Sequence, residues 1–326
     1  MKEIAVVIPN YNGRTYLTDC LMALEQETRD PQTPEFEVIV VDNGSTDGSV
    51  PLLTEQWPRV RKILLQENTG FCHAVNVGIQ ASQAPYVILL NNDTKIKSGF
   101  IKGLHRAINR DPKAFSVSAR MLMWDRPELV DDAGDYYCAL GWAFARGKGR
   151  PAEQYDRPVK VFSACGGAAI YRRSVFAEIG LFDEAHFAYL EDLDIGYRAK
   201  IYGYHNLYEP SARVLHYGSA SSGSRYNEWK TRLASANSVY VIGKNMPLLQ
   251  ILWNLPLLLV GYFIKFLFFC RKKMGMTYLK GCARGLARCF SVEGRRNRVP
   301  FRLKNLKNYL VIQWELWANF LRFLKK

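Results

Sequence analysis

The sequence has no cysteine framework. Its seven cysteines are odd in number, are scattered between Cys20 and Cys289, and include no C-x-x-C pair. Disulfide-stapled domains and structural zinc sites need closely paired cysteines, so the pattern argues against both. We therefore expect a chain that folds around an apolar core in a reducing compartment, and hydrophobic residues, at 48% of the sequence, are sufficient for that core.

The sequence also has no recognisable signal peptide, internal repeat or low-complexity segment. Its first stretch, MKEIAVVIPNYNG, has an apolar run that is too short for a signal peptide, and Pro9 interrupts that run. We therefore expect no cleaved leader, and the length allows one large domain or two smaller ones.

Excess charge is missing from most of the chain. The formal net charge is +14, but residues 271–326 contain 15 Lys and Arg against two acids, whereas residues 1–270 contain 29 against 28. A basic tail with interleaved aromatics fits an anionic lipid surface or a polynucleotide. Because the larger part is nearly neutral and has no RNA- or DNA-binding motif, we expect no nucleic-acid partner.

Apolar runs alternate with helix-like stretches over the first 110 residues. The runs cover 4–8, 36–41, 62–65 and 86–90, and the helices are expected at about 14–27, from 47, at 70–82 and at 99–109. This alternation predicts βαβ units and a mainly parallel sheet covered on both faces. Ligands of such sheets bind outside the carboxyl ends of the strands, so the polar residues that follow the four runs should converge on one site.

The remaining sequence divides into a mixed region and a tail. Residues 115–220 predict short strands, some of them antiparallel, with a long loop around 136–150 and helices at about 189–202 and 227–244. We therefore expect a catalytic domain at 1–245 and a helical tail at 246–326. Within the domain, residues 1–110 would form the nucleotide-binding half and residues 111–245 the acceptor and catalytic half.

The first apolar segment of the tail, residues 248–269, could cross a bilayer. As a helix it would measure about 33 Å, but it contains Asn254, Pro256 and Lys265. A single crossing would also place the basic tail on the side of the membrane opposite a cytosolic domain, against the positive-inside tendency.

The second apolar segment, residues 306–324, has the pattern of an interfacial helix. Its Asn308, Glu315, Asn319 and Arg322 form one polar stripe opposite a wide apolar face. We therefore predict a peripheral, monotopic or re-entrant tail that binds the anionic cytoplasmic face of the cell (inner) membrane. The alternative is that both segments are buried helices of a soluble oligomer.

Asp42 and Asp93 each follow an apolar run. Asp42 precedes N-G-S-T-D-G and could accept a hydrogen bond from a base or ribose, although the same stretch is rich in helix-capping and turn residues. Asp93, in LLNNDT, could hold Mg²⁺ or Mn²⁺, which take carboxylates together with phosphate oxygens, or could belong to a polar turn. His216 is either a structural hydrogen-bonding residue or a nitrogen ligand beside Asp93.

A second acidic group opens the helix expected at 189–202. Glu191, Asp192 and Asp194 lie in its first turn, where the helix dipole favours acids. Asp194 could also pair with Arg198 four residues later. The functional alternative is that one of these carboxylates is a general base whose pKa is tuned by its neighbours.

Taken in order, these segments resemble one family. They are VVIPNYNG (6–13), VVDNGSTDGS (40–49), NTGFCHAVNVGI (68–79), LLNNDT (89–94), GGAAIYRRSVFAEIGLFDEAHFAYLEDLDIGYRAKIYGY (166–204) and VLHYGSAS (214–221). The series, over about residues 3–245, is similar to the inverting GT-A glycosyltransferases of family two, and within it to bacterial rhamnosyltransferase-like members that build cell-surface polysaccharides. The resemblance implies an α/β fold of the GT-A type, Rossmann-like, with flanking helices and here a C-terminal helical membrane-associating tail.

The resemblance also implies binding residues. Those that would bind the nucleoside diphosphate sugar are Pro9, Asn10, Tyr11, Asn12, Asp42, Asn68, Gly70, Asn91 and Asn92. Gly166 and Gly167 would line the sugar and acceptor cleft. Where the family often has an Arg-Asn pair, this sequence has Ala236-Asn237, so the role of that arginine is lost or moved.

Catalytic and metal-binding roles follow from the same resemblance. Asp192, paired with Glu191, matches the proposed catalytic base, and Asp93 with His216 matches the metal site. Because Asn91 replaces the first acid of the family's D-x-D motif, we expect one carboxylate from this turn on the ion.

The implied activity is metal-dependent inverting sugar transfer with Mg²⁺ or Mn²⁺ as cofactor. The donor would be a nucleoside diphosphate sugar, with dTDP-rhamnose as the best guess, and the acceptor a polyprenyl-diphosphate-linked glycan. An oligomer is possible. One alternative is a nucleotidyltransferase, although residues 10–13 lack the Gly-rich basic loop of that class. The other is a non-catalytic membrane-bound nucleotide-sugar-binding protein.

Overall fold

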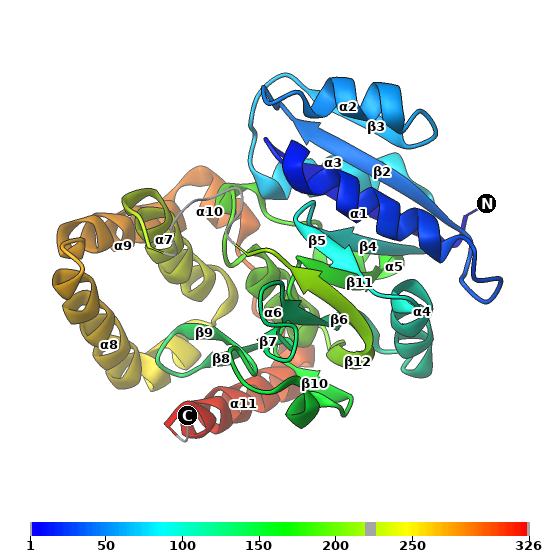
Figure 1. Cartoon of the computed structure of the whole chain (residues 1–326). Helices are drawn as coiled ribbons and strands as arrows, with labels where there is room; N and C mark the ends of the chain where they lie inside the picture. Colours follow the sequence, from blue (N-terminus) through cyan, green and yellow to red (C-terminus); the bar gives the residue numbers. More distant parts are fainter. Residues whose placement is uncertain (1, 219–225, 325–326) are drawn as a thin grey trace.

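The computed structural model describes residues 2–218 and 226–324 (Figure 1). Its main sheet has the strand order β10-β12-β6-β11-β4-β1-β2-β3, with β5 on β12 and β7 on β6. The bounds of the four strands expected from the apolar runs are β1 Ile4–Asn10, β2 Phe36–Asn43, β3 Arg61–Leu65 and β4 Tyr86–Leu90. They pair in parallel, and residues 4–8 of β1 are fully buried, as expected for a central strand covered on both faces.

The second half of the sheet is mixed. Its strands are β5 Thr94–Ile96, β6 Ala114–Met123, β7 Val130–Asp132, β10 Val159–Val161, β11 Ala168–Arg172 and β12 His205–His216. β11 runs antiparallel to both β4 and β6, whereas β12 runs parallel to β6. The expected α/β class with flanking helices is confirmed, and β11 is the strand at which the direction changes.

Helices cover both faces of this sheet. The domain helices are α1 Arg14–Glu27, α2 Ser49–Gln56, α3 Phe71–Ala81, α4 Phe100–Arg110, α5 Arg173–Ile179, α6 Glu191–Ile201 and α7 Glu228–Asn245. Apolar residues of α1 and α4 form one core cluster against the sheet, and those of α3, α5 and α6 form the other. The helices expected from apolar periodicity are confirmed, with bounds that differ by one or two residues.

One expected loop is a hairpin. The segment around 136–150 forms β8 Asp135–Cys138 and β9 Trp142–Ala145, which pair antiparallel. Tyr137 is buried against Phe162 and Tyr197, and this packing orders a stretch whose glycines suggested a loop.

The tail forms four α-helices among its described residues, on the side of the molecule away from α2 and β3 (Figure 1). They are α8 Leu248–Arg271, α9 Gly275–Phe290, α10 Val292–Asn297 and α11 Leu306–Leu324. Helix α9 was not predicted. It packs so closely on α7 that a β-carbon at Gly285 would lie 2.2 Å from the carbonyl oxygen of Ala236, so this contact requires glycine. The tail therefore packs tightly against the domain. The predicted division at residue 245 marks the start of the basic, apolar sequence.

The polar stripe of α11 faces the protein. Asn308 donates to the carbonyl of Ile201 at 2.9 Å, Glu315 pairs with Lys200 at 2.8 Å, and Asn319 donates to the carbonyl of Tyr137 at 3.0 Å. The opposite face exposes apolar side chains, namely Leu310, Val311, Trp314, Leu321 and Leu324. The predicted polar stripe is present, but it contacts Ile201, Lys200 and Tyr137 of the preceding domain.

Candidate functional site

A cavity of about 760 Å³ lies where the carboxyl ends of β1, β2 and β4 approach the start of α6. Most of the residues predicted for the site line it: Pro9, Asn10, Tyr11, Asn68, Asn91, Asn92, Asp93, Gly166, Gly167, Glu191, Asp192 and His216. Asn12, Asp42 and Gly70 are not part of this lining; Asp42 is buried next to it, whereas Asn12 is exposed. The convergence expected of the strand ends is therefore present in the structure.

Asp42 ties three strand ends together. One carboxylate oxygen accepts from the side-chain amide of Asn10 at 2.8 Å, and the other accepts from the backbone N–H of Ser45 at 2.9 Å. Asn10 in turn accepts from the side-chain amide of Asn92 at 2.7 Å. Because Asp42 is only 1% exposed, its present contacts fix the ends of β1, β2 and β4.

Asn43, which the sequence analysis did not single out, holds the next loop. Its side-chain amide donates to Asn68 and to the carbonyl of Gly70, both at 3.1 Å, and its oxygen accepts from the N–H of Thr69 at 3.0 Å. Gly70 has φ +92° and lies against Phe187, where a β-carbon would approach to 2.7 Å. Only glycine fits this turn without strain.

Asp93 and His216 lie together, as the metal prediction requires. His216 Nε2 is 3.5 Å from Asp93 Oδ1, and two ligand atoms on Mg²⁺ at about 2.1 Å would lie roughly 3 Å apart. His216 Nδ1 lies 2.7 Å from Asp131 Oδ2, and Asp131 also pairs with Lys148. A carboxylate behind a metal-binding histidine fixes the orientation of its ring, so this donor set fits a divalent cation.

His216 and Asp131 change each other's pKa. Burial opposes ionisation of both side chains, but the hydrogen bond between them, together with the charge of Lys148, lowers the pKa of Asp131 to about 2. Burial would lower the pKa of His216, yet Asp131 and Asp93 raise it to about 9. Asp131 comes from β7, whose three residues carry no sequence pattern, so no local signal pointed to it.

The three acids of α6 divide into two environments. Asp192 lies in the cavity, where its oxygens accept from the N–H of Leu193 at 2.7 Å and of Gly166 at 3.4 Å. Burial raises the pKa of Asp192, and burial together with the charge of Asp192 raises the pKa of Glu191 to about 8. Glu191 Oε2 has no hydrogen-bond partner within the described residues. Such an environment suits proton transfer.

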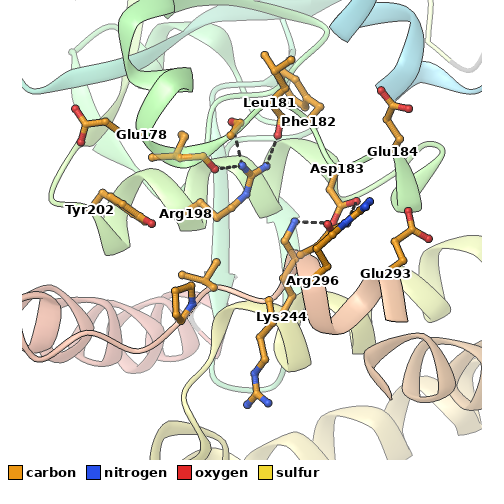
Figure 2. Close-up of a pocket in the computed structure, with 16 residues that line it drawn as sticks. Glu178, Leu181, Phe182, Asp183, Glu184, Arg198, Tyr202, Lys244, Glu293 and Arg296 are labelled. Carbon is orange, nitrogen blue, oxygen red and sulfur yellow. Dashed lines mark hydrogen bonds and ion pairs between the residues drawn. The ribbon is translucent and has the colours of Figure 1, made fainter. Parts of the chain in front are cut away.

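Asp194, by contrast, belongs to a buried ionic cluster. Lys244 Nζ lies 2.7 Å from Asp183 and 2.8 Å from Asp194, and Arg198 pairs with Asp194 at 2.9 Å. Figure 2 shows Lys244 directed at Asp183 and Arg198 directed at the carbonyls of the segment that leads to Phe182, beside a cavity of about 480 Å³. The pairing of Asp194 with Arg198 is confirmed, and Asp194 has a structural role.

The segment before the acids is strained. Phe187, Tyr189 and Leu190 all have positive φ, between 62° and 69°, which costs free energy for non-glycine residues. The side-chain amide of Asn237 donates to the carbonyls of His186, Ala188 and Tyr189, each at 2.9 Å.

An arginine from the tail completes this clamp. Arg288 of α9 donates to the oxygen of Asn237 at 3.0 Å and stacks over Tyr240. Thus the Ala236-Asn237 pair retains its asparagine in a structural role, and an arginine reaches that asparagine from residue 288. No local pattern could have predicted a contact over 51 residues.

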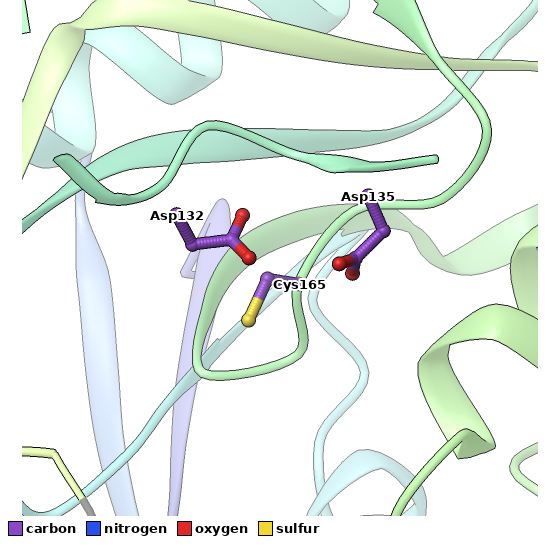
Figure 3. A group of neighbouring side chains, drawn as sticks. All are labelled: Asp132, Asp135 and Cys165. Carbon is purple, nitrogen blue, oxygen red and sulfur yellow. The ribbon is translucent and has the colours of Figure 1, made fainter. Parts of the chain in front are cut away.

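A further acidic group lies beside the cavity. Figure 3 shows Asp132, Asp135 and Cys165. Cys165 also lines the cavity of about 760 Å³ that contains Asp192. Burial raises the pKa of Asp132 to about 7 and that of Asp135 well above its ordinary value, and the charge of Asp192 contributes to both shifts. Two carboxyl groups with raised pKa therefore lie close to Cys165 at the edge of the cavity.

Comparison of the sequence with known families and proteins agrees with this geometry. Residues 5–180 match the family model described as glycosyl transferase family 2. An N-acetylglucosaminyl-diphospho-decaprenol L-rhamnosyltransferase of Mycobacterium tuberculosis is 32% identical over 251 residues, which cover 68% of this chain and 78% of that protein. Glycosyltransferase GlyG of Streptococcus pneumoniae is 28% identical over 57% of this chain and 60% of its own length.

Solved structures share the fold. GalNAc-T7, whose crystal structure contains UDP, GalNAc and Mn²⁺, matches 75% of this chain and 48% of its own with a TM-score of 0.59 at 18% identity. The mannosyltransferase PcManGT of Pyrobaculum calidifontis, in complex with GDP-Man and Mn²⁺, matches 97% of this chain and 88% of its own with a TM-score of 0.52 at 16% identity.

The contact between His216 and Asp131 generates a prediction. Asp131→Asn should weaken Mn²⁺ binding by about 10- to 100-fold, because the ring of His216 loses the carboxylate that orients it. Titration followed by electron paramagnetic resonance measures this, with Asp125→Asn on the exposed surface as the matched control. Equal Mn²⁺ affinity in the two variants would contradict the assignment.

Proposed function

The chain belongs to glycosyl transferase family 2, and we propose that it moves a sugar from a nucleoside diphosphate sugar to a lipid-linked glycan with inversion at the anomeric carbon. The observation that carries the proposal is one cavity that holds both Asp192 and the Asp93–His216 pair. Family membership favours this reaction over nucleotidyl transfer and over a non-catalytic nucleotide-sugar-binding role.

The donor half of the cavity is polar and rigid. Its wall consists of the strand ends that Asp42 ties together, so the amides of Asn10 and Asn92 are fixed before a nucleotide arrives. We propose dTDP-rhamnose as the donor, supported by the rhamnosyltransferase named among the relatives. The name of the same relative includes a diphospho-decaprenol-linked sugar, which supports a polyprenyl-diphosphate-linked acceptor. Relatives named for teichoic acid and O-antigen biosynthesis support a role in cell-surface polysaccharide synthesis.

Asp93 and His216 would hold Mg²⁺ or Mn²⁺. When bound, the ion would neutralise the charge that grows on the leaving diphosphate. Two proteins with this fold carry Mn²⁺ together with UDP or GDP-Man, which supports this cofactor. Asp131 keeps His216 Nε2 directed at Asp93, and Asn91 supplies no second carboxylate from this turn.

Asp192 is the proposed base. It would take the proton of an acceptor hydroxyl, whose oxygen forms a bond to the anomeric carbon while the bond from that carbon to the diphosphate oxygen breaks. Attack on the face opposite the leaving group inverts the anomeric centre. The raised pKa of Asp192 makes it a stronger base than an exposed aspartate, and the N–H groups of Gly166 and Leu193 orient it.

A pair of variants tests these roles. Asp192→Asn should lower nucleoside diphosphate release in the presence of acceptor by about 10³-fold or more, because the amide cannot take the proton. Glu191→Gln should retain far more activity, because the pKa of Glu191 near 8 keeps it protonated at pH 7 and glutamine resembles that form.

The wild-type kcat/KM should increase with pH through the pKa of Asp192, above the ordinary aspartate range, because only the ionised form accepts a proton. Substantial turnover by Asp192→Asn, or a larger loss in Glu191→Gln, would remove Asp192 from the base role.

The tail supports a membrane-bound enzyme. Among the described residues, α8 is the one helix long and apolar enough to span a membrane. However, its Gln250 and Asn254 are buried against Gln313 of α11, and the carbonyl of Gly261 accepts from the indole of Trp142. Because α8 is held along its length by the protein, we propose that it lies on the cytoplasmic leaflet as a monotopic element.

An apolar face of the tail would contact that leaflet. α8 and α11 both expose large side chains, including Leu249, Trp253 and Trp314, and the rings of Trp253 and Trp317 join the two helices at 5.2 Å. The 15 Lys and Arg of residues 271–326 would suit anionic headgroups at such a face.

Vesicle binding tests this orientation. The double variant Leu249→Glu with Trp314→Glu should reduce co-sedimentation with phosphatidylglycerol vesicles at least about tenfold, because both charges would enter the leaflet. Leu64→Glu with Met22→Glu, two exposed positions in the nucleotide-binding half, is the matched control. Equal binding by the two double variants, or a wild type that stays in the supernatant, would refute the membrane face.

A further inference from the structure

The cavity of about 760 Å³ that contains Asp192 is the catalytic cavity. Next to it lies a second cavity, of about 350 Å³, among the β8–β9 hairpin, the first turn of α6, and helices α7, α8 and α9. Its walls are mainly apolar and aromatic, with Leu190, Leu193, Phe268, Phe269 and Tyr278 among them. This volume lies in the range of small-ligand sites, which combine apolar walls with a few polar groups.

Two polar groups in this cavity are left without ordinary partners. Lys265 forms no ion pair with a carboxylate in the described parts of the chain and lies over the ring of Trp142 at 5.5 Å. Burial lowers the pKa of Lys265 to about 8. The hydroxyl of Tyr137, a residue that is 1% exposed, has no hydrogen-bond partner among the described residues. A partly buried cation without a carboxylate partner, set among apolar walls, fits a ligand that has an anionic group and an apolar remainder.

The second cavity shares its walls with the catalytic cavity. In the first turn of α6, Glu191 and Asp192 face the catalytic cavity, whereas Leu190 and Leu193 face the second one. At the start of α7, Trp229 lines the catalytic cavity and Thr231 the second. A ligand whose reacting end lies at Asp192 therefore has an apolar space one helical turn away.

The same cavity reaches the apolar face of the tail. Phe268 lines the cavity and is 38% exposed, and its neighbours Ile264 and Leu267 on α8 are exposed as well. A hydrocarbon chain could therefore pass along Phe268 from the cavity towards the face proposed to contact the leaflet.

We propose that this second cavity binds the isoprenoid diphosphate portion of the acceptor, with Lys265 pairing with the diphosphate and the aromatic walls packing on the first isoprenoid units. The inference rests on the proposed function, because that function requires a lipid-linked acceptor at Asp192. It goes beyond that function in assigning the lipid its own site, separate from the polar catalytic cavity.

Binding of farnesyl diphosphate to the full-length chain in detergent tests the proposal by calorimetry. Lys265→Met keeps the length of the side chain but removes its charge, and it should weaken binding by about tenfold or more. Ala234→Phe fills the cavity from α7 and should abolish binding. Lys280→Met, at an exposed position on α9, is the matched control and should bind as the wild type does. Retained affinity for nucleoside diphosphate shows that each variant is folded.

The outcomes separate this inference from the proposed function. Equal affinity of all four proteins for farnesyl diphosphate would overturn the lipid site, even if sugar transfer is intact. Displacement of farnesyl diphosphate by an equal concentration of phosphatidylglycerol would also overturn it, because the cavity would then be a general lipid site. Binding that the variants lose, in a chain without any transferase activity, would support the site and refute the proposed function.

Discussion

The proposed catalytic centre depends on one buried ammonium group. Lys244 of α7 bridges Asp183 and Asp194, and Asp194 is also held by Arg198, so α6, α7 and the segment before α6 meet at a single point. Removing one partner of such a cluster leaves an uncompensated buried charge and costs about 3–5 kcal/mol. Asp192 lies two residues before Asp194 on the same helix, so this cluster sets its position. Asp194 therefore has a structural role, whereas Asp192 makes no ion pair in this cluster and faces the cavity.

The tail contributes to that centre as well as to the proposed membrane face. Small residues let α9 lie close to α7, and this contact brings Arg288 to Asn237. Asn237 then holds the backbone carbonyls of residues 186–189, the strained segment that directly precedes Glu191 and Asp192. If the tail contacts the leaflet as proposed, its completion of the clamp would couple that contact to the positions of Glu191 and Asp192.

Much of this could be predicted from the sequence, because local patterns carry the information. Buried parallel strands produce continuous apolar runs in the sequence. The polar residues at the carboxyl ends of such strands meet at one edge of the sheet, so the cavity wall formed by Asn10, Asn92 and Asp93 was expected. The acidic start of α6 was also expected, although the separate fates of Asp192 and Asp194 depend on Lys244, fifty residues further along the chain.

The features that escaped prediction arise from long-range contacts. Asp131 lies in a three-residue strand without periodicity, and only the fold brings it to His216. The stripe on α11 shows a different limit, since amphipathicity identifies two faces but does not say what each contacts. There the polar face binds Ile201 and Tyr137, and the apolar face is exposed.

The central claim is that Asp192 and the Asp93–His216 pair act on the same sugar, one on the incoming hydroxyl and the other at the leaving diphosphate. The most direct test is the anomeric configuration of the product, measured by the one-bond carbon–proton coupling at the transferred sugar in nuclear magnetic resonance spectra. The account predicts a glycosidic bond inverted relative to the donor. A product that retains the donor configuration would contradict it.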